Sequence, residues 1–222
     1  MVKHSVVFPV YITKPEQFDM TLKAISLARE CTKLEYELII VETVSQYFSS
    51  GLADIYIHEK DRHESRGVRS MNRAFRLASG ENLTMFTTDV FVRPGWLEAI
   101  EECLELKDCG AATLATSQFR HTPQDKIEEG NWWSIATIPT KVWAEVGEFD
   151  ERYKGVWSDT DYLMRLYESG RKMYRNFKVV VDHLIGATEY EEKGHKEAYS
   201  FGQELFRNKF EGSKLPIYGE LR

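Results

Sequence analysis

Residues Gly147 to Gly170 read GEFDERYKGVWSDTDYLMRLYESG, and this stretch indicates best how the chain folds. Its second half predicts an amphipathic helix, because apolar side chains recur at helical spacing and Gly170 suits a C-terminal end. Asp159 and Asp161 lie where this helix begins. An acidic side chain there is either a cap, which the helix dipole stabilises by about 0.3–1 kcal/mol, or a catalytic base. Taken alone, the stretch favours the cap.

On both sides of this helix, apolar runs and amphipathic stretches alternate along the chain. Strands are predicted at Ser5–Ile12, Glu37–Val41, Ile55–His58, Asn82–Thr87, Gly110–Thr116, Ser134–Pro139 and Lys178–Val181. Helices are predicted from Pro15 to about Cys31, over Ser70–Ala78, from Pro94, after Thr140 and over Glu191–Phe210. This alternation predicts parallel βαβ units in an α/β fold, whose ligands bind at the C-terminal strand ends. The polar, aperiodic stretch Gln118–Asn131 is the expected mobile active-site loop.

The composition is that of one globular domain of 222 residues. A formal charge of −6 and the lack of a basic tail argue against a large nucleic-acid footprint. The sequence has no run of 18 apolar residues, so no membrane span is predicted. The N-terminus lacks the features of a signal peptide. Three cysteines without metal-ligand spacing fit a reducing compartment, so a cytoplasmic location is expected.

Polar or acidic residues lie at the ends of several predicted elements. In chain order the motifs are SVVFPVYI (5–12), VETVS (41–45), Asn72 to Glu81, TTDVFVRPGWL (87–97), GEFDE (147–151), SDTD (158–161) and VDHLIGAT (181–188). Their order and spacing resemble the family-2 glycosyltransferases of the GT-A fold. The sequence departs from that pattern at Ala74, where the family has Gly, and in VETVS, where it has Val-Asp-Asp-Gly-Ser.

The resemblance implies a mostly parallel, twisted sheet flanked by helices, in a single Rossmann-like nucleotide-binding domain over residues 1–222. Residues 1 to about 117 would form the nucleotide-sugar half, and 118–222 the acceptor half and C-terminal helix. The implied reaction is transfer of a sugar, with inversion, from a nucleotide-diphosphate donor, expected to be a UDP-sugar, to an acceptor hydroxyl. Such a reaction needs a base on the acceptor and positive charge on the departing diphosphate.

Asp159 matches the catalytic base of the family. The helix N-terminus would keep it ionised while nearby phosphates would raise its pKa, and the sequence does not show which effect is larger. Asp161 is expected to cap or brace the same turn on the acceptor side. Trp132 and Trp133 are the other candidates for acceptor binding, since sugars stack on aromatic faces, although adjacent strand residues point to opposite faces and one of the two would enter the core.

Asp89 matches the last acid of the Asp-x-Asp metal motif, and His183 matches a His that can ligate the same metal. A hard cation such as Mn²⁺ or Mg²⁺ binds oxygen ligands and bridges phosphates. The first acid of the motif is missing, because Thr87 and Thr88 precede Asp89. This departure puts donor affinity and metal dependence in question.

The remaining donor-site candidates follow from the same resemblance. Glu42, in place of the first Asp of the nucleotide-binding pair, would accept hydrogen bonds from the uracil or ribose. Arginines of the basic segment 63–73 would pair with phosphate. The full set expected to bind the donor is Pro9, Tyr11, Glu42, Arg66, Arg69, Thr88 and Asp89.

Two rival functions compete with an active enzyme. One is a catalytically silent module that binds nucleotide sugars or docks a partner, motivated by the missing acid. The other is a glycosyltransferase acting on modified nucleic-acid bases, against which the negative charge counts. A dinucleotide-binding dehydrogenase is disfavoured, because no Gly-x-Gly-x-x-Gly follows the first strand.

Overall fold

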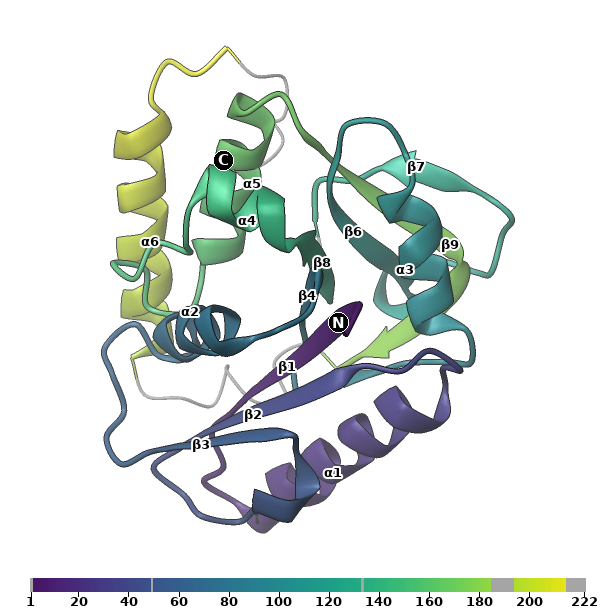
Figure 1. Cartoon of the computed structure of the whole chain (residues 1–222). Helices are drawn as coiled ribbons and strands as arrows, with labels where there is room; N and C mark the ends of the chain where they lie inside the picture. The colour runs from purple at the N-terminus through teal and green to yellow at the C-terminus, as the bar shows by residue number, and fades with distance from the viewer. Residues whose placement is uncertain (1, 49, 133, 185–193, 215–222) are drawn as a thin grey trace.

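The computed structural model describes residues 2–48, 50–132, 134–184 and 194–214 and shows one mixed sheet with helices on both faces (Figure 1). The strands are β1 (His4–Val10), β2 (Glu37–Thr43), β3 (Ile55–Glu59), β4 (Asn82–Met85), β5 (Val90–Phe91), β6 (Cys109–Thr116), β7 (Ile127–Glu129), β8 (Ala136–Pro139) and β9 (Lys172–His183). The helices are α1 (Pro15–Glu30), α2 (Gly67–Leu77), α3 (Trp96–Leu104), α4 (Thr140–Val146), α5 (Ser158–Glu168) and α6 (His195–Phe210). Two short 3-10 turns lie at Ser50–Leu52 and Ser117–Phe119.

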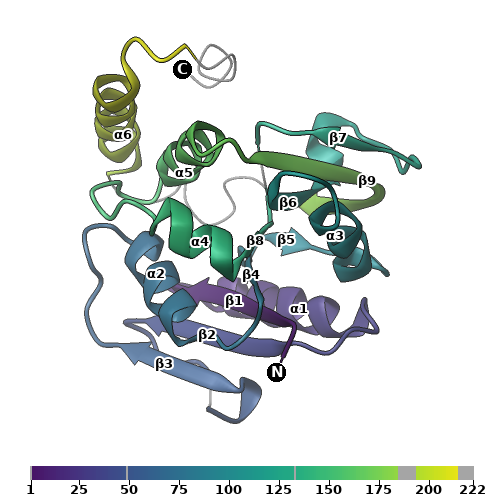
Figure 2. The same ribbon diagram turned by 45° about the horizontal axis from the view of Figure 1, so that its top comes forward.

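The strand order in the sheet is β3-β2-β1-β4-β8-β6-β9-β5, with β7 paired to β9 (Figure 2). Strands β1, β2, β3 and β4 are parallel to one another, and β6 is parallel to β9. Strand β8 runs antiparallel between β4 and β6, so β6 and β9 point the same way as β1. The expected mostly parallel α/β sheet is therefore confirmed.

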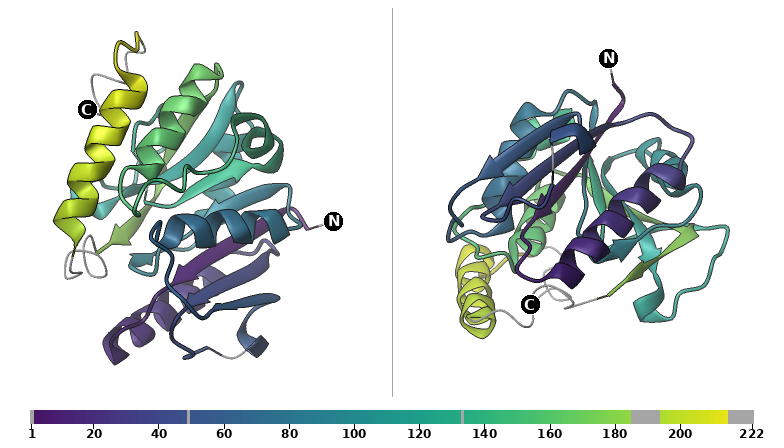
Figure 3. Two further views of the ribbon diagram at one scale, coloured as in Figure 1. Left: turned by 90° about the vertical axis from the view of Figure 1, so that its left-hand side faces the viewer. Right: turned by 90° about the horizontal axis from the view of Figure 1, so that it is seen from below.

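Apolar side chains on the two faces of the sheet form two cores. Val6 and Phe8 of β1 pack on the face covered by α1 and α3, whereas Val7 between them packs on the face of α2, α4, α5 and α6. This alternation follows from the period-2 geometry of a strand. Figure 3 shows α1 lying across one face, and α6 beside α5 on the other. Among the described residues, no helix has both the length and the apolar character needed to cross a bilayer.

The predicted elements lie close to the observed ones, with three differences. Val90 and Phe91 form the short strand β5, which was not predicted. Residues 127–129 of the expected loop form strand β7, which pairs with β9. Strand β9 begins at Lys172, six residues earlier than the apolar run predicts, because charged residues alternate with buried ones such as Met173 in its first half. The first residues of the predicted C-terminal helix, 191–193, lie outside the described residues. The expected division near residue 117 stays a prediction.

Candidate active site

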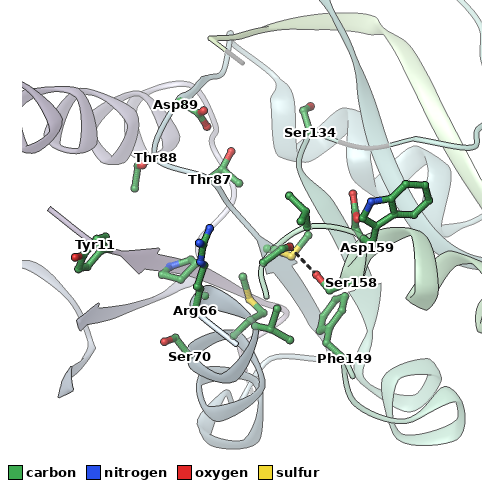
Figure 4. A pocket seen from close by; sticks show the side chains of 18 of the residues that line it. Tyr11, Arg66, Ser70, Thr87, Thr88, Asp89, Ser134, Phe149, Ser158 and Asp159 are labelled. Atoms are coloured by element: carbon green, nitrogen blue, oxygen red, sulfur yellow. Dashed lines mark hydrogen bonds between the residues drawn. The ribbon is translucent and has the colours of Figure 1, made fainter. Parts of the chain in front are cut away.

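A cavity of about 730 Å³ opens at the C-terminal ends of β1 and β4 and at the N-terminal ends of α2, α5 and α6. Its volume lies in the range that holds small-molecule ligands, about 300–1,000 Å³. Figure 4 shows Asp89, Thr87 and Thr88 on one side and Asp159 with Ser158 on the other. The place is the one that parallel α/β sheets offer to ligands, because strand ends and helix N-termini converge there.

Asp89 and His183 meet because the short strand β5 pairs with the end of β9. Val90 lies opposite His183, and the Leu184 N–H donates to the Asp89 carbonyl at 3.0 Å. The distance from His183 Nε2 to Asp89 Oδ1 is 3.6 Å. The indole of Trp132 stacks on the His183 ring, with the ring centroids 5.9 Å apart. The side chains predicted to hold a metal are thus brought together at the cavity.

These two residues fit a divalent cation as a partial ligand set. Ligands about 2.1 Å from one cation lie at most about 4.2 Å apart, so a separation of 3.6 Å lets one ion contact both. Within the described residues, no third His, Cys, Asp or Glu joins them. Oxygen atoms of a bound diphosphate and of water would have to complete the coordination, as Mg²⁺ sites commonly arrange.

Asp159 lies on the first turn of α5, after a sharp change of chain direction. The N-cap is Trp157, which takes the left-handed conformation with φ = 71° and makes no side-chain cap hydrogen bond. The cap that the stretch alone favoured at Asp159 or Asp161 is therefore wrong, because both lie inside the first turn. The half-buried Asp159 carboxylate accepts a hydrogen bond from the Thr160 N–H at 2.8 Å. Burial raises its pKa, and the bonds from the backbone N–H groups oppose that rise without cancelling it. Asp159 is therefore a stronger base than an exposed aspartate.

Asp161, two residues later, lies outside the cavity lining and belongs to a buried ion-pair network. Its side chain is fully buried and contacts Arg165 Nε at 2.8 Å and Lys209 Nζ at 2.5 Å. The Tyr153 hydroxyl donates to the same carboxylate at 3.2 Å. Because Lys209 comes from α6, this network attaches α6 to α5. The geometry supports the bracing role expected of Asp161 and places it outside the cavity.

Helix α6 also packs on the cavity wall through a glycine. A Cβ on Gly202 would lie 2.9 Å from Trp157 Cδ1 and 3.1 Å from the Val156 carbonyl, so only glycine lets the helix approach this closely. The approach brings His195 and Tyr199, one helical turn apart, to the cavity. Sequence reasoning did not identify these two residues, although their i, i+4 spacing was the available signal.

Glu42 does not line the cavity. Its carboxylate is fully buried and accepts hydrogen bonds from the Tyr47 N–H at 2.7 Å, the Phe48 N–H at 3.1 Å and the Tyr56 hydroxyl at 2.7 Å. Burial and the bond to Glu42 raise the pKa of Tyr56 to about 12, so its hydroxyl stays a donor. Both oxygens of Glu42 thus hold the loop after β2, and its neighbour Thr43 lines the cavity instead.

We expect Glu42→Gln to destabilise the protein by about 2 kcal/mol, because either amide orientation turns its NH₂ group toward a buried N–H. The melting temperature should fall by about 4–8 °C in a chain of this size. Thermal denaturation followed by circular dichroism measures the change. Tyr56→Phe, which removes one donor only, is the control and should cost less. A Glu42→Gln variant that melts normally but loses nucleotide affinity would show that Glu42 binds the nucleotide.

The other donor-site candidates divide between the cavity and the surface. Pro9, Tyr11, Arg66 and Thr88 line the cavity, whereas Arg69 is exposed on α2 and does not. Figure 4 shows the Arg66 side chain extending into the cavity. Its φ of 53° is uncommon for a residue with a side chain and sets its direction at the start of α2.

Arg62 is a further lining residue that the sequence did not single out. Its guanidinium lies 4.0 Å from the centre of the Tyr11 ring, a cation–π contact. The two residues are 51 positions apart, so no sequence motif links them. Together they place an aromatic ring and a positive charge at the end of β1.

Aromatic side chains form the opposite wall. Trp132 lines the cavity, and Phe119 packs edge-on against it at 4.9 Å between centroids while staying half exposed. Tyr199 of α6 also lines the cavity with its ring partly exposed. Trp133, the other predicted acceptor residue, lies outside the described residues. The arrangement offers apolar ring faces to the cavity.

No protein-family model matches the sequence, and a search of curated proteins finds no match. Solved glycosyltransferase structures share the fold at low identity. TarS from S. aureus matches 99% of this chain with a TM-score of 0.67 and 12% identity, and this chain spans 41% of the TarS chain. Residues 1–349 of TarS in complex with UDP match with a TM-score of 0.66, and this chain covers 68% of that one.

A second solved protein gives the same result. The mannosyltransferase PcManGT from Pyrobaculum calidifontis, in complex with GDP-Man and Mn²⁺, matches 99% of this chain with a TM-score of 0.66 and 14% identity. This chain covers 78% of that structure. The described chain therefore has a GT-A-like glycosyltransferase fold.

Proposed function

We propose that the protein is an inverting glycosyltransferase that moves a sugar from a nucleoside-diphosphate donor to an acceptor hydroxyl. The observation that supports this proposal is the arrangement of one cavity. Asp89 and His183 face it from the strand ends, and the half-buried Asp159 faces it from the start of α5. The fold of solved glycosyltransferases agrees with this assignment.

The residues divide the chemistry between the two sides. Asp89 and His183 would hold a divalent cation, which supplies positive charge to the diphosphate as it leaves. Arg66 would contact the same phosphates, as arginine does in a bidentate fashion. On the other side, the Asp159 carboxylate accepts the proton of the acceptor hydroxyl as that oxygen attacks the anomeric carbon. Attack from the side opposite the leaving diphosphate inverts the configuration at that carbon.

We take a UDP-sugar as the donor, with GDP-sugars as the comparison. Tyr11 and Arg62 present a ring and a guanidinium at the end of β1, where a nucleobase could stack. TarS was solved with UDP and PcManGT with GDP-Man, so both bases enter the test.

Thermal stabilisation by nucleotides is the experiment that tests the proposal. The panel contains UDP, GDP, UDP-glucose and GDP-mannose, each with and without Mn²⁺. A ligand at about 100 times its Kd stabilises by about 2.7 kcal/mol. For this chain length we expect the melting temperature to rise by roughly 5–11 °C. If no member of the panel shifts the melting temperature and calorimetry at millimolar ligand detects no binding, the proposed function is wrong.

Asp89→Asn should remove most of the Mn²⁺-dependent part of nucleotide binding, because an amide is a weaker ligand for a hard cation than a carboxylate. Titration calorimetry of UDP with and without Mn²⁺ measures that part separately. Asp182→Asn is the matched control, since Asp182 is also an acid of this region but pairs with Arg93 at 2.5 Å. Equal Mn²⁺ dependence in wild type and Asp89→Asn would exclude Asp89 as a ligand.

The alternative of a catalytically silent nucleotide-sugar-binding module is favoured by one observation. Thr87 occupies the place of the first acid, so the cation has few protein ligands among the described residues. Slow hydrolysis of the bound donor distinguishes the two functions. An enzyme hydrolyses the donor at a rate that depends on Asp159, whereas a silent module binds it without turnover.

A further inference from the structure

Two buried hydroxyl groups in the cavity have no hydrogen-bond partner among the described residues. They are Oγ1 of Thr87 and Oγ of Ser134, and both residues line the cavity. Ser134 is only 3% exposed. Buried hydroxyls in folded proteins are nearly always hydrogen-bonded, so a pair left open beside a cavity points to a ligand. Figure 4 shows both residues on the wall between Asp89 and Asp159.

The register of β4 and β8 explains why both residues face the cavity. Leu83 lies opposite Ile138 and Met85 opposite Ala136 in this antiparallel pair. Continuing the register by two residues places Thr87 opposite Ser134, just beyond the last paired residues. Because side chains alternate between the faces, both lie on the face of Met85, which also lines the cavity.

Other buried hydroxyls of the same strands find partners inside the protein. The Thr84 and Thr137 hydroxyls, a cross-strand pair on the opposite face, bond to each other at 2.8 Å. The hydroxyl of Thr113 on β6 donates to the Ile135 carbonyl at 2.5 Å. Thr87 and Ser134 differ from these bonded hydroxyls, and they differ from Thr116, whose buried hydroxyl also has no described partner, in lining the cavity.

We propose that Thr87 and Ser134 bind hydroxyl groups of the donor's sugar and so select a neutral sugar. This inference rests on the proposed function. The sugar must lie between the diphosphate, held near Asp89 and His183, and the acceptor next to Asp159, and the hydroxyl pair lies on that stretch of wall. A hydroxyl both donates and accepts, which matches the hydroxyls of a neutral sugar. Replacing the acid of the family motif with Thr87 also removes a negative charge from this wall.

The experiment separates the sugar from the rest of the donor. Calorimetry measures the affinity of UDP and UDP-glucose, and of GDP and GDP-mannose, for wild type, Thr87→Val and Ser134→Ala. Within each pair, the affinity for the nucleotide sugar divided by the affinity for the nucleoside diphosphate gives the contribution of the sugar. We use the pair for which this ratio is larger in wild type. Each variant should reduce that ratio by about 3–10-fold, which corresponds to one net hydrogen bond. Affinity for the diphosphate alone should stay unchanged.

Thr116→Val is the matched control. Its hydroxyl is also buried and without a partner among the described residues, but Thr116 does not line the cavity. This variant should keep the wild-type ratio. Melting temperatures show whether all variants fold. Ser134→Ala should not lower the melting temperature, since the lost hydroxyl makes no hydrogen bond within the protein.

Three results would overturn the inference while leaving the proposed function intact: a wild-type protein whose affinity gains nothing from the sugar, variants that keep the full ratio, or variants that lose affinity for the diphosphate itself. The last result would assign the hydroxyls to phosphate. By contrast, a wild type that binds neither UDP nor GDP contradicts the proposed function itself.

Discussion

Replacing Asp159 with asparagine should lower sugar transfer by about 10²–10⁴-fold, the usual weight of a general base. Asparagine has nearly the same shape but cannot take the acceptor proton. Its side-chain oxygen keeps the hydrogen bond from the Thr160 N–H, and no helix cap is lost because the N-cap of α5 is Trp157. Melting temperature and donor affinity should therefore change little. Single-turnover transfer measured beside donor affinity tests this, with donor hydrolysis as the assay until an acceptor is found.

The pH profile gives a second reading of the same side chain. The base must be deprotonated, so activity falls as pH falls through its pKa. Because burial raises the pKa of Asp159, the acidic limb of the wild-type profile should lie above the usual range of an aspartate near 3.8. The Asn variant should lack that limb. Near-normal transfer by the variant would rule out Asp159 as the base.

Asp161→Asn, the same substitution two residues later, should have the opposite effect. Asp161 is fully buried between Arg165 and Lys209, so removing its charge leaves two cations with a neutral partner. Breaking a buried pair costs about 3–5 kcal/mol, and the partial exposure of both cations puts this case near the lower end. The melting temperature should fall by about 6–12 °C.

Urea denaturation of Asp161→Asn and Asp159→Asn side by side measures the contrast. The Asp161 variant should lose stability while the folded fraction keeps its affinity for nucleotide, since Asp161 does not line the cavity. Lys209→Met, which removes one of the two cations, should destabilise by less. A stable Asp161→Asn protein that binds donor but transfers no sugar would show that Asp161, and not Asp159, acts on the acceptor.

The fold was predictable because nearly every strand of the sheet is a short apolar run between helices of regular period. Strand β7 and the first half of β9 were not, since their residues are mostly polar and their pairing joins segments about 45 residues apart in the chain. The short strand β5 was also not predicted, although its pairing with β9 brings Asp89 to His183.

The candidate site was predictable in part, and geometry explains the rest. Successive strand residues point to opposite faces, so in VETVS only one of Glu42 and Thr43 can face the cavity, and it is Thr43. Two residues along a helix amount to a rotation of about 200°, which directs Asp159 to the cavity and Asp161 to the core. The motif order located these turns of the chain but could not give the direction of each side chain.

Strand β8 has a further consequence, because it is the antiparallel member at the centre of the sheet. It begins at the edge where β6 ends, and the chain that connects the two strands contributes Phe119, Asn131 and Trp132 to the cavity. The tip of this excursion, residues 122–125, is exposed. Doubling such a loop costs only about 0.6 kcal/mol of closure entropy. Lengthening the chain at residues 122–125 would thus alter this connection while the sheet, Asp89, His183 and Asp159 stay in place.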